Sequence, residues 1–166
     1  MVGSVRGLFS LFAVVVFGGV AAATGCGGDE SEAAEFRERA NALCREAERE
    51  VEQLGPPTSR RQLERYLRDT LRFARDYTQR FEALEPPPEL ASLHERSARL
   101  NRRAAELTER VLDDLAAGGA PEQLMPVFAA KLLELAKRDN ELSRRLGLPD
   151  CVTPLPGPDS KPPAPA

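Results

Sequence analysis

Four stretches of this chain carry apolar residues at alternating steps of three and four positions, and Pro or Gly separates each stretch from the next. The pattern is clearest over 58–84, where the steps continue without a miss through Leu63, Leu67, Thr70, Ala74, Tyr77, Phe81 and Leu84. Residues three and four apart share one face of a helix. Each stretch therefore predicts an amphipathic helix with one buried seam.

The breaks between the seams set the bounds of the first three helices. We expect the first over about 32–54, because Gly55-Pro56-Pro57 cannot continue it. The second should begin after an N-cap at Thr58 or Ser59 and run to Leu84. The third can begin with Pro88 as its first helical residue, since proline's missing N–H costs nothing there, and should end near 118–119.

The fourth helix contains a proline that decides where it starts. Pro126 would remove a backbone hydrogen bond from a helix interior. We therefore expect the regular helix to begin at Pro126, with 121–125 as a separate turn. Gly147 should end this helix in a left-handed conformation, with Leu148 as its hydrophobic contact.

Short links between helices of this kind predict an all-α fold, an antiparallel up-down-up-down four-helix bundle over 32–148 that follows a cleaved signal peptide. The composition agrees, because 30% of residues are charged and only 5% aromatic, which suits narrow seams and solvated outer faces. The competing fold is a long two-helix coiled coil. The Pro and Gly breaks argue against it.

The N-terminal segment predicts an export signal. Its apolar run over 8–22 is about 15 residues long, short of the roughly 20 that a membrane-spanning helix needs. The sequence Ala23-Thr24-Gly25-Cys26 resembles the bacterial lipobox, although Ala23 stands where the family usually has Leu. The resemblance implies removal of residues 1–25 and attachment of palmitate-type acyl chains to Cys26. The protein would then sit on the extracytoplasmic face of the cell membrane.

An ordinary signal peptidase could instead cleave after Ala21-Ala22-Ala23 and release a soluble protein. Cysteine parity favours acylation. The chain has three cysteines. In an oxidising compartment two of them would form a disulfide and the third would have no partner. If Cys26 carries lipid, Cys44 and Cys151 remain as an even pair. A bond between them would close about 107 residues, and the chain after Gly147 would have to double back to make it. An interchain disulfide is the alternative.

Both ends of the helical region also resemble a group of small uncharacterised actinobacterial lipoproteins. The shared stretches are Ala40-Asn41-Ala42-Leu43-Cys44 and Gly147-Leu148-Pro149-Asp150-Cys151. The resemblance implies a common disulfide framework that uses Cys44 and Cys151. It brings no known activity with it.

Two segments flank the expected bundle. Residues 26–31 are small and acidic, and predict a flexible tether. Residues 149–166 are rich in proline and predict a disordered or polyproline-like tail. Such a tail could be a spacer that crosses the cell wall, a ligand for a partner, or simply a flexible end.

The residue types that catalysis and cofactors require are scarce. His94 is the only histidine, and its position beside Leu93 at the seam's edge predicts an exposed or boundary residue. A zinc site needs several converging ligands. Some two dozen helical residues, roughly 35 Å, separate His94 from Met125, so the two cannot bind one haem iron. We therefore expect no metal, no cofactor and no enzymatic activity, and a net charge of −3 gives no basic field for nucleic acid.

Arginines form a second stripe on the helix expected over 59–84. Its members are Arg61, Arg65, Arg68, Arg72 and Arg75. One interpretation is an anion-binding face for phospholipid headgroups or acidic wall polymers. The favoured interpretation is ion pairing along the helix, because Glu64–Arg68, Arg65–Asp69 and Arg72–Asp76 are all four residues apart.

Aromatic residues gather on one side of the same helix, at Tyr66, Phe73, Tyr77 and Phe81. Packing along the seam explains them, and a lipophilic pocket between helices is the alternative. Together these features predict a membrane-anchored extracytoplasmic lipoprotein whose helical module binds an envelope protein or a cell-wall component. The alternative function is a structural spacer of the envelope.

Overall fold

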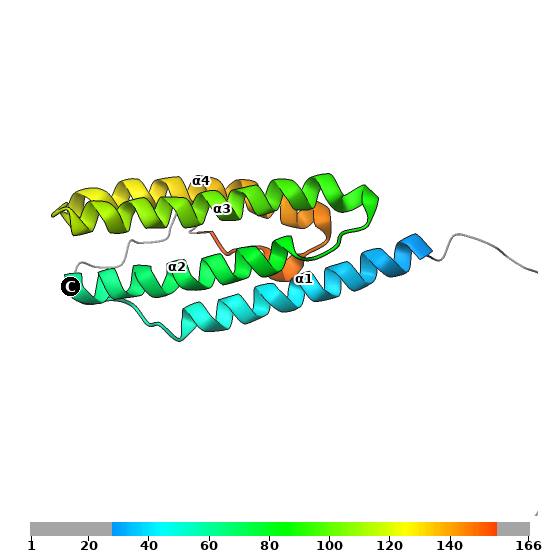
Figure 1. Ribbon diagram of the computed structural model, residues 1–166, viewed down its shortest axis with the longest axis horizontal. Helices are drawn as coiled ribbons and strands as arrows, with labels where there is room; N and C mark the ends of the chain where they lie inside the picture. Colours follow the sequence, from blue (N-terminus) through cyan, green and yellow to red (C-terminus); the bar gives the residue numbers. More distant parts are fainter. Residues whose placement is uncertain (1–27, 156–166) are drawn as a thin grey trace, which may run out of the picture.

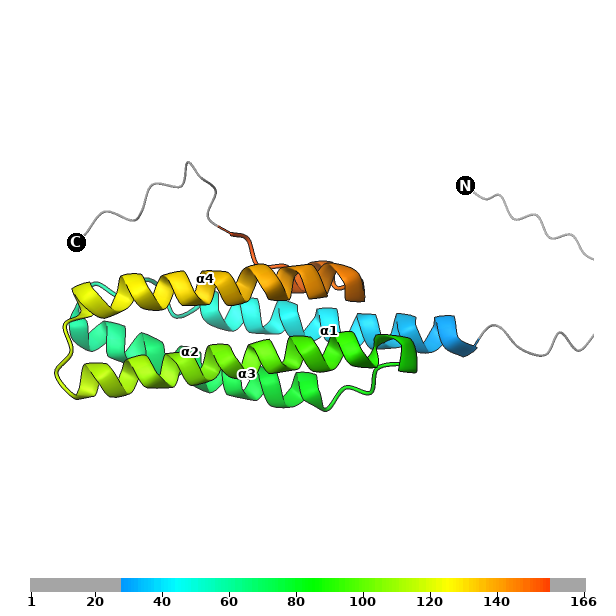
Figure 2. The same cartoon turned by 90° about the horizontal axis from the view of Figure 1, so that it is seen from above.

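The computed structural model describes residues 28–155 and shows an all-α chain that runs up-down-up-down (Figures 1 and 2). The elements are α1 (Gly28–Glu52), α2 (Arg60–Glu82), α3 (Pro88–Ala116), α4 (Pro121–Leu146) and a short 3₁₀ helix, η1 (Pro149–Cys151). The predicted four-helix bundle is confirmed. The signal peptide, Cys26 and the last part of the tail lie outside the described residues.

Most helix ends follow the local rules that the sequence suggested. Ser59 is the N-cap of α2 and accepts a hydrogen bond from the Gln62 N–H, while α3 begins at Pro88. Gly147 ends α4 with a φ of 76°, and the Leu148 N–H then reaches back 2.9 Å to the Ser143 carbonyl. A side chain at Gly147 would also meet Arg37, because an added Cβ would lie 2.8 Å from its Nε.

Two helices begin earlier than expected. α4 starts at Pro121 and carries Pro126 inside it, so the separate turn over 121–125 is wrong. The missing N–H of Pro126 deprives only the carbonyl of Glu122, which lies in the exposed first turn where water can bind it. α1 starts at Gly28, so residues 28–31 of the expected tether are helical.

The core has two clusters, one toward each end of the bundle. The first joins α1 to the three other helices and contains Ala33, Phe36, Ala40, Phe81, Leu90, Ala98, Leu146 and Leu148. The second lies among α2, α3 and α4 and contains Leu67, Leu107, Val111, Leu115 and Phe128. α3 packs along both α2 and α4, so it buries a wider face than a single seam.

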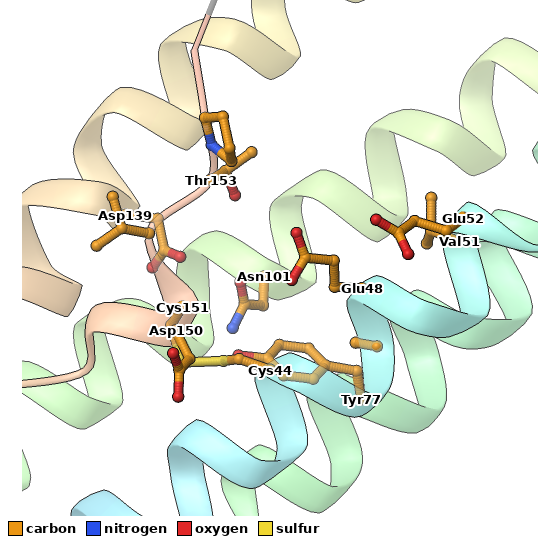
Figure 3. A pocket seen from close by; sticks show the side chains of 13 residues that line it. Cys44, Glu48, Val51, Glu52, Tyr77, Asn101, Asp139, Asp150, Cys151 and Thr153 are labelled. Carbon is orange, nitrogen blue, oxygen red and sulfur yellow. A yellow bond between two sulfur atoms is a disulfide. The ribbon is translucent and has the colours of Figure 1, made fainter.

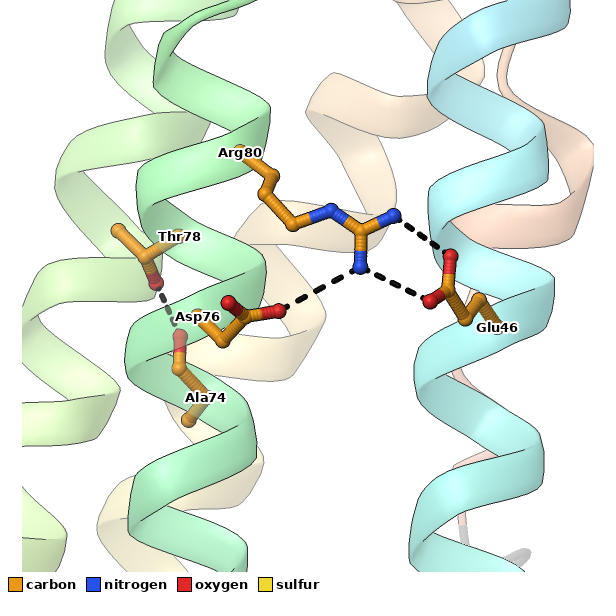
Figure 4. Close-up of polar contacts among 5 residues, drawn as sticks. All are labelled: Glu46, Ala74, Asp76, Thr78 and Arg80. Atoms are coloured by element: carbon orange, nitrogen blue, oxygen red, sulfur yellow. Dashed lines mark hydrogen bonds and ion pairs between the residues drawn. The ribbon is translucent and has the colours of Figure 1, made fainter.

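An exposed ion-pair network also links α1 to α2 (Figure 4). Arg80 donates to both carboxylate oxygens of Glu46, at 2.9 and 2.6 Å, and to Asp76 at 3.4 Å. The hydrogen bond from Arg80 lowers the pKa of Glu46. Because all three side chains are solvated, this network adds little to the free energy of unfolding.

After Gly147 the chain reverses and lies between α1 and α4 (Figure 1); we call residues 147–155 the return segment. Three side chains of α1, one turn apart, hold the end of α4 and the first part of the return segment. Arg37 Nε donates to the Leu146 carbonyl at 2.9 Å, Asn41 Oδ1 accepts from the Asp150 N–H at 3.0 Å, and Arg45 pairs with the Asp150 carboxylate.

On the other side, α4 holds the later part of the return segment. Asn140, only 2% exposed, donates to the Thr153 carbonyl and accepts from the Thr153 N–H, both at 2.8 Å. Cys44 and Cys151 form a disulfide within the chain, with their Cα atoms 5.1 Å apart. The reversal of the chain after Gly147, which this bond requires, brings the two residues together. The tail expected from 149 therefore has its first seven residues packed on the bundle.

Candidate ligand cavity

The return segment does not fill the space between α1 and the α3–α4 pair, and a cavity of about 380 Å³ remains beside the disulfide (Figure 3). The disulfide forms one end of this cavity. Its walls come from α1, α2, α3, α4 and the return segment, and consist of Cys44, Ala47, Glu48, Val51, Glu52, Tyr77, Asn101, Asp139, Asp150, Cys151, Val152, Thr153 and Pro154.

Tyr77 lies at the disulfide end of the cavity. Its hydroxyl is 3.3 Å from Cys44 Sγ, and because that sulfur is in a disulfide, the tyrosine is the donor. Burial raises the pKa of Tyr77 well above its usual range, and the nearby Asp139 carboxylate adds to this effect. Tyr77 is therefore a neutral wall residue whose O–H is already used.

Asn101, from α3, has an unused hydrogen-bond donor. Its side-chain Nδ2 is buried and makes no well-formed hydrogen bond, but the amide points toward Tyr77 and the disulfide (Figure 3) and partly opposes the rise in the pKa of Tyr77. A buried donor without an acceptor costs about 1–3 kcal/mol. Its place in a cavity wall means that a molecule in the cavity could supply the acceptor.

Asp139, from α4, is a half-buried carboxyl in the same wall. The Ser97 hydroxyl donates to its Oδ1 at 2.6 Å, and within the described residues no Arg or Lys pairs with it. Burial raises the pKa of Asp139, and the Ser97 hydrogen bond opposes that shift only in part. Asp139 is thus a carboxylate that the fold itself does not neutralise.

A second, apolar hollow of about 600 Å³ adjoins the first. The two share four wall residues: Asn101, Asp139, Thr153 and Pro154. Alanine at 104, 129, 130 and 136 leaves this space open between α3 and α4, and leucines complete the wall, namely Leu100, Leu132, Leu133, Leu135 and Leu155. The polar cavity and the apolar groove therefore meet at Asn101 and Asp139.

The Asp139 carboxyl predicts a specific dependence of stability on pH. Its folded-state pKa lies above the ordinary aspartate value of 3.8, so its contribution to stability is fully present below that value and is lost as pH rises through the folded pKa. Asp139→Asn keeps an oxygen for Ser97 and removes the buried charge. We expect this variant to melt at a higher temperature than the wild type at neutral pH.

Thermal melts across pH test this expectation. The gap between Asp139→Asn and wild type should close as pH falls below 3.8, where the carboxyl becomes protonated in both states. Glu141→Gln, which removes an exposed carboxylate from the same helix, should show no such pH-dependent gap. A wild type that melts higher than Asp139→Asn at neutral pH would mean that Asp139 has a cationic partner in solution.

His94 is buried, which corrects the expectation of an exposed or boundary residue. It is 6% exposed, and its Nε2 lies 2.8 Å from the Phe81 carbonyl. Because a carbonyl only accepts, Nε2 carries the proton. The ring lies between those of Phe36 and Phe81, with centroids 5.6 and 4.7 Å away. His94 joins α3 to α2 through this bond and is not among the residues that line the cavity.

The arginine stripe of α2 is exposed, and three of its members have acidic neighbours. Arg68 lies 3.8 Å from Glu64, Arg72 lies 3.6 Å from Asp69, and Arg75 reaches Glu109 of α3 at 2.7 Å. Of the predicted pairs, Glu64–Arg68 forms, whereas Asp69 and Asp76 pair with Arg72 and Arg80 instead. Over 28–155, Arg61 and Arg65 have no ion pair, and the anion-binding face stays a prediction.

The aromatic residues of α2 divide between core and cavity. Phe81 is buried in the first core cluster and stacks on Tyr77, with ring centroids 5.7 Å apart. Tyr77 also lines the cavity, whereas Tyr66 flanks the second core cluster. The seam explains their spacing, and the hydroxyl of Tyr77 is used in its hydrogen bond to Cys44 Sγ.

No protein-family model, no curated protein and no solved structure matches this chain. None of the helices in residues 28–155 has the length and apolar character to cross a membrane. The same part of the chain holds no group of three or more His, Cys, Asp or Glu side chains arranged to bind a metal ion.

Proposed function

We propose that this chain is an extracytoplasmic lipoprotein, anchored to the cell membrane through acyl chains on Cys26, and that its helical bundle is a non-enzymatic binding module. The observation that carries the proposal is the Cys44–Cys151 disulfide. Disulfides persist in oxidising compartments outside the cytoplasm. This one occupies two of the three cysteines and leaves Cys26 with a separate role.

The cavity supports the binding part of the proposal. Small-molecule sites are concave and mostly apolar, with a few polar groups that fix orientation. The cavity and its adjoining groove have this composition, with Asn101 and Asp139 as the polar groups where they meet. The disulfide and the Asn140–Thr153 hydrogen bonds hold the return segment in place as one wall.

Replacement of Cys26 tests the anchor. In cells labelled with an alkyne fatty acid, we expect the wild type to take up the label and to sediment with membranes, because two or more acyl chains anchor a protein stably. Cys26→Ala should take up no label and should leave the membrane fraction. Intact-mass analysis should show the acyl mass on the wild type alone.

The matched control is a chain with Cys44→Ser and Cys151→Ser, which keeps Cys26. It should retain the label and the membrane association, which shows that the acylated thiol is the one outside the disulfide. If Cys26→Ala still carries acyl chains or still sediments with membranes, the anchor is elsewhere and the proposed location is wrong.

A structural spacer of the envelope is the second candidate, and the tail supports it, since residues 152–166 contain six prolines. Because Thr153 is hydrogen-bonded to Asn140, a deletion that tests this role should remove only 156–166. A spacer should lose its envelope phenotype with this deletion, whereas a binding module that uses the cavity should keep its ligand.

A further inference from the structure

We propose that the cavity and its adjoining groove bind an amphipathic organic cation, with its ammonium group at Asp139 and its apolar body in the groove between α3 and α4. This inference rests on the proposed binding function and names the chemical class of its ligand. Three observations carry it: the shape of the combined space, its unpaired Asp139 carboxyl and the sign of its charge.

The combined space fits a ligand with one polar end. The cavity of about 380 Å³ and the groove of about 600 Å³ share Asn101, Asp139, Thr153 and Pro154 as a common wall. Beyond that wall, the α4 side of the groove is lined by alanine and leucine up to Asp139. A ligand whose head reaches the shared wall can therefore bury an apolar chain of substantial length beside α4.

The shared wall offers one charged group whose interactions the protein leaves incomplete, the Asp139 carboxyl. Asp139 uses one oxygen for the Ser97 hydroxyl, and within the described residues its charge has no cationic partner. An uncompensated charge away from water is unfavourable, so a ligand that brings an ammonium to Asp139 removes a cost that the fold now bears.

The charge around the cavity selects against an anionic head. Glu48 and Glu52 of α1 extend from the opposite wall toward the return segment (Figure 3), and in the described part of the chain neither pairs with an Arg or Lys. Asp150 is already neutralised by Arg45. No basic residue is among those that line the cavity. A carboxylate or phosphate head would meet three unpaired carboxylates, whereas an ammonium would be attracted by all three.

Three ligands of equal chain length separate head-group charge from apolar contact: decylamine, decanol and decanoate, each kept below the concentration at which it aggregates. The protein is the full chain with Cys26→Ala, which has no acyl group of its own to occupy the groove. Tyr66→Phe in this background leaves Tyr77 as the only tyrosine, and the chain has no Trp. Intrinsic fluorescence then reports on the cavity wall, and titration calorimetry gives the affinity.

At neutral pH we expect decylamine to bind saturably, about tenfold or more tightly than decanoate, with decanol between them. Asp139→Asn should weaken decylamine binding by about tenfold and leave decanol unchanged, because only the charged contact is lost. Glu50→Gln, which removes a carboxylate from α1 outside the cavity wall, should change neither. Ala136→Phe fills the groove and should abolish binding of all three ligands.

Decanoate that binds as tightly as decylamine, or decylamine binding that Asp139→Asn leaves unchanged, would overturn the cationic ligand. If Ala136→Phe still abolished binding in that case, the proposed binding function would stand with another ligand class. If no ligand binds saturably, or if Ala136→Phe has no effect on any of them, the cavity is not a binding site and the proposed binding function fails with it.

Discussion

Removal of the disulfide by Cys44→Ser and Cys151→Ser together is expected to lower the free energy of unfolding by about 4–5 kcal/mol, because the bond closes a loop of about 100 residues in the unfolded chain. The sequence separation is 107. For a domain of this size the loss corresponds to a fall in melting temperature of roughly 10–20 °C. Urea unfolding followed by circular dichroism measures it directly.

The same experiment distinguishes an unfolded-state effect from a loss of native contacts. The Asn140–Thr153 and Asn41–Asp150 hydrogen bonds do not involve sulfur, so the double variant should keep its helical signal in the absence of denaturant. Wild type under a thiol reductant should match the double variant, and Cys26→Ala without reductant should match the wild type. A loss below about 1 kcal/mol would show that the unfolded chain is already restricted without the bond.

The helices could be predicted from the sequence because their signals are local. A seam with three- and four-residue steps, a serine N-cap at 59 and a glycine at 147 each act within one or two turns. The exceptions are also local. Pro126 was expected to begin a helix, yet it lies one turn inside α4, where only the carbonyl of exposed Glu122 loses its partner.

The burial of His94 could not be predicted from the apolar seam. A single seam assumes that a helix buries one narrow face, but α3 packs along both α2 and α4. Its buried face therefore widens beyond the seam to include the polar residues His94 and Thr108, which are buried. A histidine next to a leucine at the seam's edge is then inside the protein, and its N–H meets the Phe81 carbonyl.

The return segment and the cavity depend on contacts that no local pattern specifies. Composition predicted a proline-rich tail from 149, and the disulfide required only that the chain reverse. What holds the segment is the pairing of Asn41 with Asp150 and of Asn140 with Thr153, and these partners are 109 and 13 residues apart. The cavity is the space left between that segment and α1, so its position follows from tertiary packing alone.

Phe36→Ala is expected to cost about 3–5 kcal/mol of unfolding free energy, which is the usual range for a fully buried phenylalanine. Phe36 has no exposed surface and lies in the core cluster that joins α1 to the rest of the bundle. Its ring meets that of His94 edge to face, at 85°, a contact that adds to the loss from the cavity alone.

The control for this prediction is Phe73→Ala on α2, where the ring is half-buried and one face lies 4.9 Å from the Arg72 guanidinium. Phe73→Ala should lower the free energy of unfolding by about 1 kcal/mol, within the range of ordinary single substitutions. Urea unfolding of the two variants at one pH gives the comparison. Equal losses would mean that α1 is not packed through Phe36 in solution. Because Cys44 and Glu48 follow Phe36 at two and three further turns of the same helix, one wall of the cavity would then be displaced as well.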